Sequence, residues 1–173
     1  MNRGVGVCAG IVMGLFSSGA FAETGKAVIQ ATADGSSVRG TAVLADTPAG
    51  LQVSVSVTGV APGKHAIHIH QYGTCDDHGS AAGSHFNPSN VTHGFLPTDG
   101  LAKAHPGDLG NLEVGPDGSG TLSLTLPGVS LTGSKYSVAG RAIVLHEKVD
   151  DFGQPTGNAG SRIGCGAIVI TKD

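Results

Sequence analysis

Leu51-Gln52-Val53-Ser54-Val55-Ser56-Val57 is the stretch of sequence that decides the fold class. Every second residue is apolar and the residues between are polar, so one side of the segment suits a core and the other suits solvent. This alternation has the period of a β-strand, in which successive side chains point to opposite faces. The stretch therefore predicts a half-buried strand.

Short segments of the same kind occur on both sides of this strand. They span residues 27–33, 38–44, 65–70, 109–114, 121–126, 141–146 and 167–171. Clusters such as Gly-Pro-Asp-Gly at 115–118 separate them, because glycine accepts positive φ and proline stops strand pairing. Eight strands without a convincing helix predict an all-β fold, either a sandwich or a barrel.

Two long intervals, residues 72–106 and 147–164, break this rhythm. Both are polar and rich in glycine, and they hold or border most of the eight histidines. Long loops on a rigid β scaffold are usually either functional or disordered. The histidines favour the first reading, so we expect two long functional loops.

The N-terminal segment predicts export. Arg3 precedes an apolar run from Val5 to Phe16, and small residues then lead to Ala20-Phe21-Ala22. The run is shorter than the ~20 residues of a membrane-spanning helix, and Ala-x-Ala is typical of a signal peptidase site. We expect residues 1–22 to be a signal peptide rather than a membrane anchor, and residues 23–173 to form one domain in the periplasm or another secreted location.

Cleavage at this site would change the cysteine count and the charge. Cys8 would be removed, and the remaining pair, Cys75 and Cys165, predicts one disulfide in an oxidising compartment. Loss of Arg3 leaves nine Lys and Arg residues against 13 Asp and Glu residues, a net charge of −4. A nucleic-acid partner is therefore not expected. No segment after residue 22 is apolar over the ~20 residues needed to span a bilayer, so we expect no membrane partner after cleavage.

Histidines alternate with isoleucines in Ala66-Ile67-His68-Ile69-His70. On a strand the two isoleucines point one way and His68 and His70 the other, so two imidazoles lie side by side. One such pair is weak evidence for a metal site. The signal strengthens with the other polar residues found at element ends or in the long intervals: His85, His93, His105, Asp108 and His146.

The donor types indicate which metals these residues suit. Imidazole nitrogen binds both copper and zinc, and several histidines with one aspartate and no thiolate favour zinc over softer metals. Four histidines for copper, and three histidines plus an aspartate for zinc, would need eight positions from seven residues. One histidine would therefore have to bridge the two metals.

Four segments resemble the signatures of copper-zinc superoxide dismutases, and the similarity extends over nearly the whole chain after residue 22. The segments are Gly83–Pro88, His105–Asn111, His146–Lys148 and Gly157–Gly166. The resemblance implies an eight-stranded Greek-key β-sandwich or barrel, copper and zinc as cofactors, and superoxide as the substrate. It also implies a Cys75–Cys165 disulfide.

The same resemblance assigns roles to individual residues. It makes His68, His70, His85 and His146 copper ligands, and His85, His93, His105 and Asp108 zinc ligands, with His85 bridging. Asp150 resembles the carboxylate that holds one histidine of each metal, and Arg162 resembles the arginine beside the copper channel. His65 is expected to be structural, and His78 matches no family position.

Some features leave alternatives open. The interval between His146 and Arg162 is shorter than the guidance loop of many eukaryotic members, and Cys75, five residues after His70, resembles the bacterial exported branch. A homodimer is a possible assembly, but the eukaryotic interface is not carried across. A non-catalytic periplasmic copper- or zinc-binding protein of the same fold is the main alternative, and a zinc hydrolase is a weaker one.

Overall fold

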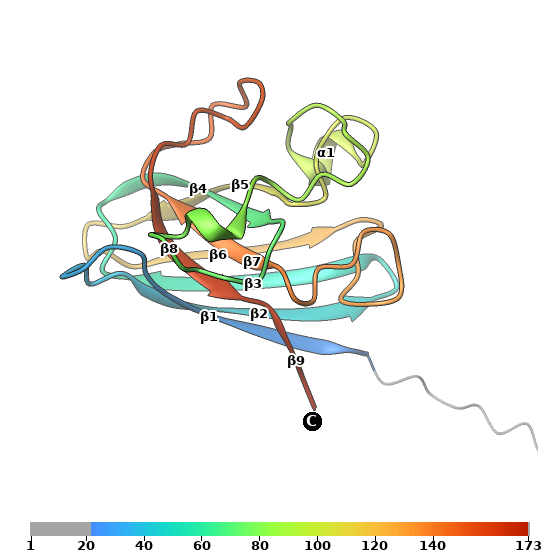
Figure 1. Ribbon diagram of the computed structural model, residues 1–173, viewed down its shortest axis with the longest axis horizontal. Coiled ribbons are helices and arrows are strands. Elements are labelled where there is room, and N and C mark those ends of the chain that lie inside the picture. Colours follow the sequence, from blue (N-terminus) through green and yellow to red (C-terminus); the bar gives the residue numbers. More distant parts are fainter. Residues whose placement is uncertain (1–21, 173) are drawn as a thin grey trace, which may run out of the picture.

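Nine antiparallel strands and two very short helical turns form the described part of the protein (Figure 1). The computed structural model describes residues 22–172. The strands are β1 (Thr24–Ala31), β2 (Arg39–Thr47), β3 (Gly50–Thr58), β4 (Gly63–His70), β5 (Asp108–Val114), β6 (Gly120–Leu126), β7 (Ala142–His146), β8 (Arg162–Ala167) and β9 (Val169–Thr171). The helical turns are η1 (Ser80–Ala82) and α1 (Leu96–Asp99).

The sheet closes on itself into a flattened barrel. Its strand order is β2-β3-β6-β5-β4-β7-β8-β1, and β1 pairs with β2 as well as with β8. Two junctions are short, because β5 and β6, like β8 and β1, share only two residue pairs each. β9 is an extra strand that continues the line of β8 along β1. The prediction of an all-β, eight-stranded sandwich or barrel is confirmed.

The connections have Greek-key topology. β3 is followed along the chain by β4, yet β6 and β5 lie between them in the sheet. β6 is likewise followed by β7, with β5 and β4 between them. Both connections therefore cross from one side of the barrel to the other, which brings β4 next to β7.

Strand β3 has the alternation that its sequence predicts. Leu51, Val53, Val55 and Val57 are at most 3% exposed, whereas the polar residues between them face solvent. Aliphatic side chains from the other strands complete one continuous core. Burial of this apolar area is the main favourable contribution to the stability of the barrel.

Strand β8 corrects the expected boundary of the second long loop. The loop was expected to reach Gly164, but β8 begins at Arg162, and the predicted strand 167–171 is divided between the end of β8 and β9. Glycines interrupt any alternation here, which explains the error. They are needed because a Cβ at Gly166 would lie 2.5 Å from the Val28 carbonyl oxygen, so the two backbones approach too closely for a side chain.

A third long connection, residues 127–141, was not singled out from the sequence. It joins β6 to β7 and buries Val129, Leu131 and Val138 in the main core. These apolar residues made it less distinct from the strands than the two polar intervals. It contributes side chains to the core, whereas the other two loops build a site.

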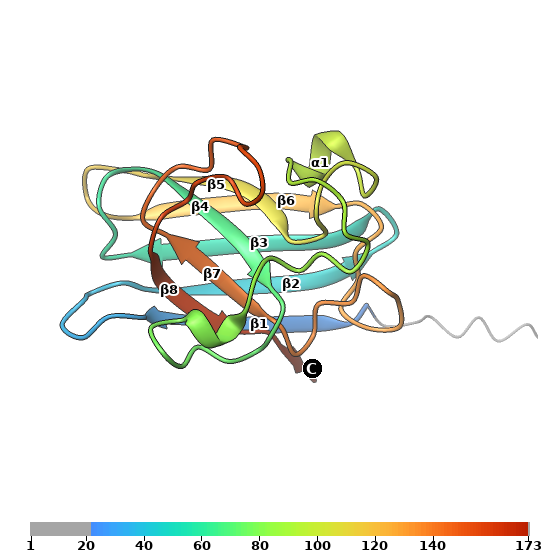
Figure 2. The same cartoon turned by 45° about the horizontal axis from the view of Figure 1, so that its top comes forward.

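The two polar loops lie over the same side of the barrel (Figure 2). The first runs from Gln71 to Gly107 and contains η1 and α1, and the second runs from Glu147 to Ser161. A disulfide between Cys75 and Cys165 joins the first loop to β8, as predicted. Among residues 22–172, no helix is long and apolar enough to cross a membrane.

Candidate metal centre

Strand β4 supplies the first two histidines. Ile67 and Ile69 are fully buried in the barrel core, so His68 and His70 point out of the opposite face of the strand. They are nevertheless at most 1% exposed, because the polar loops cover them. The strand alternation predicted from the sequence thus places two imidazoles beneath the loops.

Irregularities in two strand pairings lie next to the histidines. The register of β4 against β5 shifts between Ala66 and His68, and that of β7 against β8 shifts between Leu145 and His146. Such bulges change the direction in which a side chain points. His146 ends β7, the strand that pairs directly with β4.

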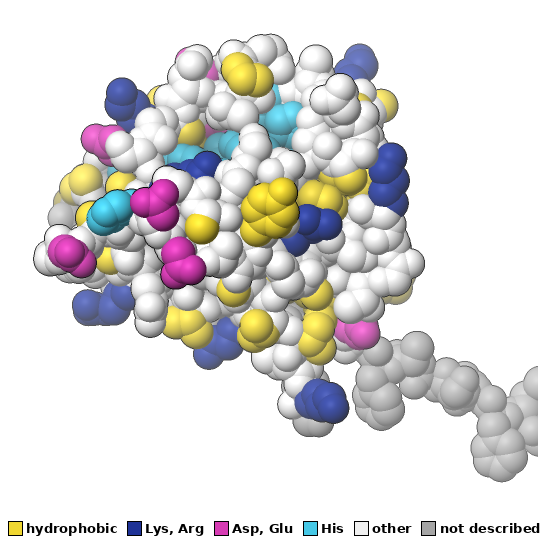
Figure 3. All heavy atoms as spheres, in the orientation of Figure 1, with side chains coloured by type: hydrophobic (Ala, Val, Ile, Leu, Met, Phe, Trp, Pro, Cys, Tyr) yellow, Lys and Arg dark blue, Asp and Glu magenta, His cyan; other side chains and the backbone are white. Residues whose placement is uncertain are grey.

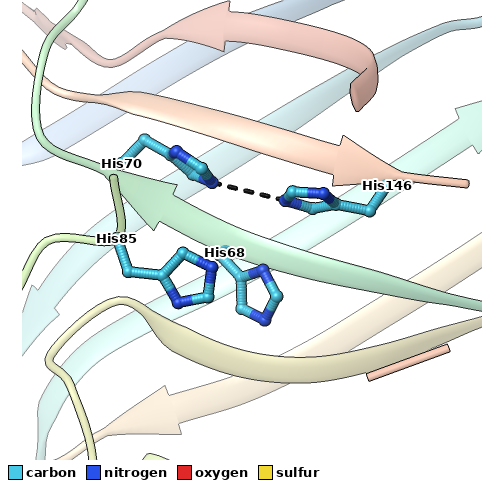
Figure 4. A group of neighbouring side chains, drawn as sticks. All are labelled: His68, His70, His85 and His146. Carbon is cyan, nitrogen blue, oxygen red and sulfur yellow. Dashed lines mark hydrogen bonds between the residues drawn. The ribbon is translucent and has the colours of Figure 1, made fainter. Parts of the chain in front are cut away.

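The first group of candidate ligands consists of His68, His70, His85 and His146. One ring nitrogen from each lies within 4.8 Å of the others, and all four residues are buried. His70 and His146 point toward one another, and the rings of His68 and His85 lie side by side with centroids 3.9 Å apart (Figure 4). An isolated β-bridge between His70 and His85 holds the loop against the end of β4.

Outer hydrogen bonds determine which nitrogens of this group carry lone pairs. His70 Nδ1 donates to the Gly83 carbonyl at 2.9 Å, and His146 Nδ1 donates to the Gly160 carbonyl at 3.4 Å. Both Nε2 atoms are then unprotonated in the neutral rings, and they face each other at 3.3 Å (dashed line in Figure 4). Two lone pairs at this distance suit a shared cation.

The second group consists of His85, His93, His105 and Asp108, all buried. Asp108 Oδ1 lies 3.1 Å from His85 Nδ1 and 3.0 Å from His105 Nδ1. His93 Nδ1 lies 2.9 Å from Asp108 Oδ2 without forming a hydrogen bond to it. Three nitrogens and a carboxylate around one point match the donor set of a tetrahedral zinc site.

Asp150 joins the two groups. Its Oδ2 accepts a hydrogen bond from His68 Nε2 at 2.8 Å, and His93 Nε2 donates to Oδ1 at 2.9 Å. This fixes the orientation of one histidine in each group and leaves its Nδ1 free. Gly157 lies directly over the contact, since a Cβ there would overlap Asp150 Oδ1 and lie 2.8 Å from His93 Nε2.

Two buried nitrogens test whether metals fit these groups. His68 Nδ1 and His93 Nδ1 are fully buried without any hydrogen-bond partner, one in each group. Burying an unpaired polar atom costs free energy, and folded proteins rarely do so without a reason. A cation in each group would satisfy both atoms, so the residues of both groups fit metal ions.

The protonation states favour the same conclusion. Burial lowers the pKa of His70 to about 2 and that of His146 to about 3, so both rings are neutral ligands at pH 7. Burial alone would also lower the pKa of His93, but Asp108 and Asp150 outweigh it and raise this pKa to about 9. The two carboxylates thus stabilise a positive charge in the second group.

Arg162 lies at the edge of the first group. Its guanidinium donates to the carbonyls of Ser80 at 3.3 Å, Gly83 at 2.6 Å and Gly79. Because Gly83 also accepts the His70 hydrogen bond, Arg162 is connected to a candidate copper ligand through one carbonyl. Histidine atoms are visible between the covering loops beside a basic side chain (Figure 3).

Several contributors to the site were not found from the sequence. Asn111 forms two hydrogen bonds with the backbone of Asp150, and Gln154 forms two with the backbone of His93. No motif marks Gln154, because its role depends on how the second loop folds back. His65 bonds the carbonyls of His146 and Ala61, which agrees with a structural role.

The antiparallel barrel and its two buried groups of candidate ligands, which share His85, are typical of a binuclear metalloprotein. A family model described as "Copper/zinc superoxide dismutase (SODC)" matches residues 38–168. The chain therefore belongs to the copper/zinc superoxide dismutase family.

Individual relatives agree with this assignment. "Extracellular superoxide dismutase [Cu-Zn]" of Caenorhabditis elegans is 42% identical over 130 residues, which cover 71% of this chain and 57% of that relative. The protein of the same description from Brugia pahangi is 36% identical over 159 residues, covering 86% and 78%. The structure described as "Crystal Structure Analysis of the clock protein EA4" matches with a TM-score of 0.77 and 32% identity, over 93% of this chain and 100% of that one.

Proposed function

We propose that this protein is a superoxide dismutase, in which one superoxide loses an electron to give dioxygen and a second gains an electron and two protons to give hydrogen peroxide. His68, His70, His85 and His146 would hold copper, and His85, His93, His105 and Asp108 would hold zinc. Bound copper supplies the one-electron couple for both half-reactions, whereas zinc has no redox chemistry. The shared histidine of two buried four-donor groups is the observation that carries the proposal.

His85 is the residue through which the two groups interact. Its Nδ1 faces Asp108 in the second group, so its Nε2 is the nitrogen available to the first. Between the half-reactions, Nε2 is the atom at which a proton can be held beside the substrate. Its Nδ1 contacts keep the ring in place meanwhile.

Arg162 provides the positive charge that a small anion needs. The described chain is acidic overall, so attraction to the first group must be local. A guanidinium keeps its charge at all relevant pH values and offers several donors. Its carbonyl contacts fix the group beside His70, where superoxide would dock.

Metal analysis combined with a superoxide-decay assay on the purified protein tests this function. We expect one copper and one zinc per chain and rapid decay of superoxide. If protein loaded with both metals does not accelerate the decay of superoxide above its rate in buffer, a non-catalytic copper- or zinc-binding protein is favoured instead. The complete ligand set with Arg162 argues against that alternative, and the four protein donors of the second group argue against a zinc hydrolase, which needs an open zinc position.

We also propose that the protein is exported after cleavage following Ala22 and belongs to the bacterial exported branch. The signal-like segment lies almost entirely outside the described residues, so the proposal rests on its sequence and on the extracellular relatives. The branch assignment rests on the position of Cys75 and the short second loop. N-terminal sequencing of exported protein should begin at Glu23, and sedimentation would establish whether it is a dimer.

A further inference from the structure

The backbone of His93 has an unusual set of partners. Its N–H donates to Gln154 Oε1 at 3.0 Å, and Gln154 Nε2 donates to its carbonyl oxygen at 2.9 Å. Within residues 22–172 these are the only hydrogen bonds of that peptide N–H and carbonyl. One side-chain amide thus does for His93 what a neighbouring strand would do in a sheet.

This matters because His93 lies in irregular chain. No strand or helix contains it, whereas His68, His70 and His146 are held by strand pairing. His93 is itself 4% exposed, so its backbone groups have little access to water as a replacement partner. Its position therefore depends on the second loop.

The same loop holds the ring of His93 as well. Asp150 accepts from Nε2, and the Phe152 ring stacks on the imidazole with centroids 6.2 Å apart and an interplanar angle of 22°. The backbone contact through Gln154 completes the restraint. All three residues lie between His146 and Arg162, in the second polar loop.

We propose that Gln154 is a positioning residue of the zinc group, which ties the second loop to His93 and slows the release of zinc without acting on copper. The inference rests on the proposed assignment of His93 as a zinc ligand. Both hydrogen bonds of the Gln154 amide go to the backbone of His93. Gln154 therefore acts on the second group through the position of His93 and is not itself a candidate ligand. Outer contacts of this kind typically change metal affinity by about 10- to 100-fold.

Two substitutions disrupt the pair of hydrogen bonds between Gln154 and the His93 backbone while keeping the size of the side chain. Gln154→Met loses both hydrogen bonds, and Gln154→Glu keeps an acceptor for the N–H but places a second acceptor against the His93 carbonyl. The Gln154 side chain lies mostly at the surface, so both variants are expected to fold. Gln52→Met on the exposed face of β3 is the matched control.

The measurement is the rate of zinc release from fully loaded protein to a colorimetric chelator, with copper retention followed by electron paramagnetic resonance. We expect both Gln154 variants to release zinc about 10-fold faster or more, while copper release and the Gln52→Met rates stay within about twofold of the parent. Cobalt placed in the zinc group should also show an altered visible spectrum in the variants.

Zinc release within about twofold of the parent in both variants would overturn the proposal. Equal acceleration of copper and zinc release would also overturn it, since that result indicates general loosening rather than positioning. The zinc content of the parent tests the ligand assignment separately. If the parent holds zinc and both variants release it at the parent's rate, the positioning role of Gln154 is rejected while the assignment of the zinc ligands stands.

Discussion

Asp108 makes more contacts in the candidate zinc group than one ligand atom requires. Besides its contacts with the histidines, Oδ2 accepts hydrogen bonds from the backbone N–H groups of Gly94 and His105. Burial alone would raise the pKa of Asp108, but contacts with His105, His85 and His93 outweigh it and hold this pKa well below its usual range. The residue is therefore ionised and connects the first loop to the start of β5.

Replacing Asp108 with Ala should remove zinc and lower thermal stability while copper still binds. The reason is that the variant loses a zinc donor and leaves the N–H groups of Gly94 and His105 without their acceptor. Elemental analysis and calorimetry measure the two effects, with Asp34→Ala in an exposed turn as the control. A variant that lost copper first and kept zinc would contradict the ligand assignment.

At Arg162, charge and geometry can be separated by two substitutions. Arg162→Glu should slow catalysis far more than Arg162→Lys, because lysine keeps the charge and loses only the planar set of donors. Raising ionic strength should slow the parent, since screening shortens the attraction to about 10 Å at 0.1 M salt. The Glu variant should lose this dependence or reverse it.

Pulse radiolysis across a salt series, with metal content checked for each variant, decides the role of Arg162. Arg39→Glu on the exposed part of β2 changes the net charge equally and serves as the control. If the effect of Arg162 is local, the catalytic rate of Arg39→Glu and its salt dependence should match those of the parent. Equal rates for the parent and Arg162→Glu would remove Arg162 from the mechanism.

Strand β8 links the site to the scaffold at the level of whole elements. It begins at Arg162, carries Cys165 and pairs with both β7 and β1. The Cys75–Cys165 disulfide then joins it to the loop whose carbonyls contact Arg162. β8 is therefore connected to the first loop twice, through the hydrogen bonds of Arg162 and through the disulfide.

Removing this disulfide with Cys75→Ser and Cys165→Ser should lower the free energy of unfolding substantially. The two cysteines are 90 residues apart, and the chain-entropy model gives about 4 to 5 kcal/mol for closing a loop of that size, with measured values often smaller. Urea denaturation of metal-free parent and double variant measures the difference. An unchanged midpoint would show that the disulfide contributes nothing to stability.

Histidine burial gives the whole molecule a specific response to acid. Below the ordinary histidine pKa of 6.5, the unfolded chain binds protons that His70, His85 and His146 do not accept in the fold, where burial lowers their pKa to between about 2 and 4. Such groups reduce stability as pH falls through the unfolded pKa. Burial also lowers the pKa of His68, so His93, whose raised pKa acts in the opposite direction, is one residue against four.

The metal-free protein should therefore become less stable as pH falls below 6.5. Thermal unfolding measured between about pH 8 and pH 5 tests this expectation. The metal-loaded protein, in which the same nitrogens are occupied, is the control and should keep its stability to lower pH. A flat profile for the metal-free form would contradict the expectation.

The sequence predicted the strands that have one buried and one solvent-exposed face, and it was less informative about the other segments. β3 and β4 were found because Val53 and Ile67 alternate with polar residues. β8 was missed, because glycines replace the side chains that would reveal a period. Gln154 and Asn111 were missed because their partners are backbone groups that only the folded loops bring near.

The order of the candidate ligands along the chain has a consequence for biosynthesis. All four donors of the second group are present once residues 85–108 have emerged, whereas the first group also needs His146 and the Gly160 carbonyl that orients it. A chain made from its N-terminus therefore presents its zinc donors before β7 and β8 exist, although the contacts of Asp150 and Gln154 that position His93 come later. We expect zinc to act as an early template for assembly and copper to enter a nearly finished molecule.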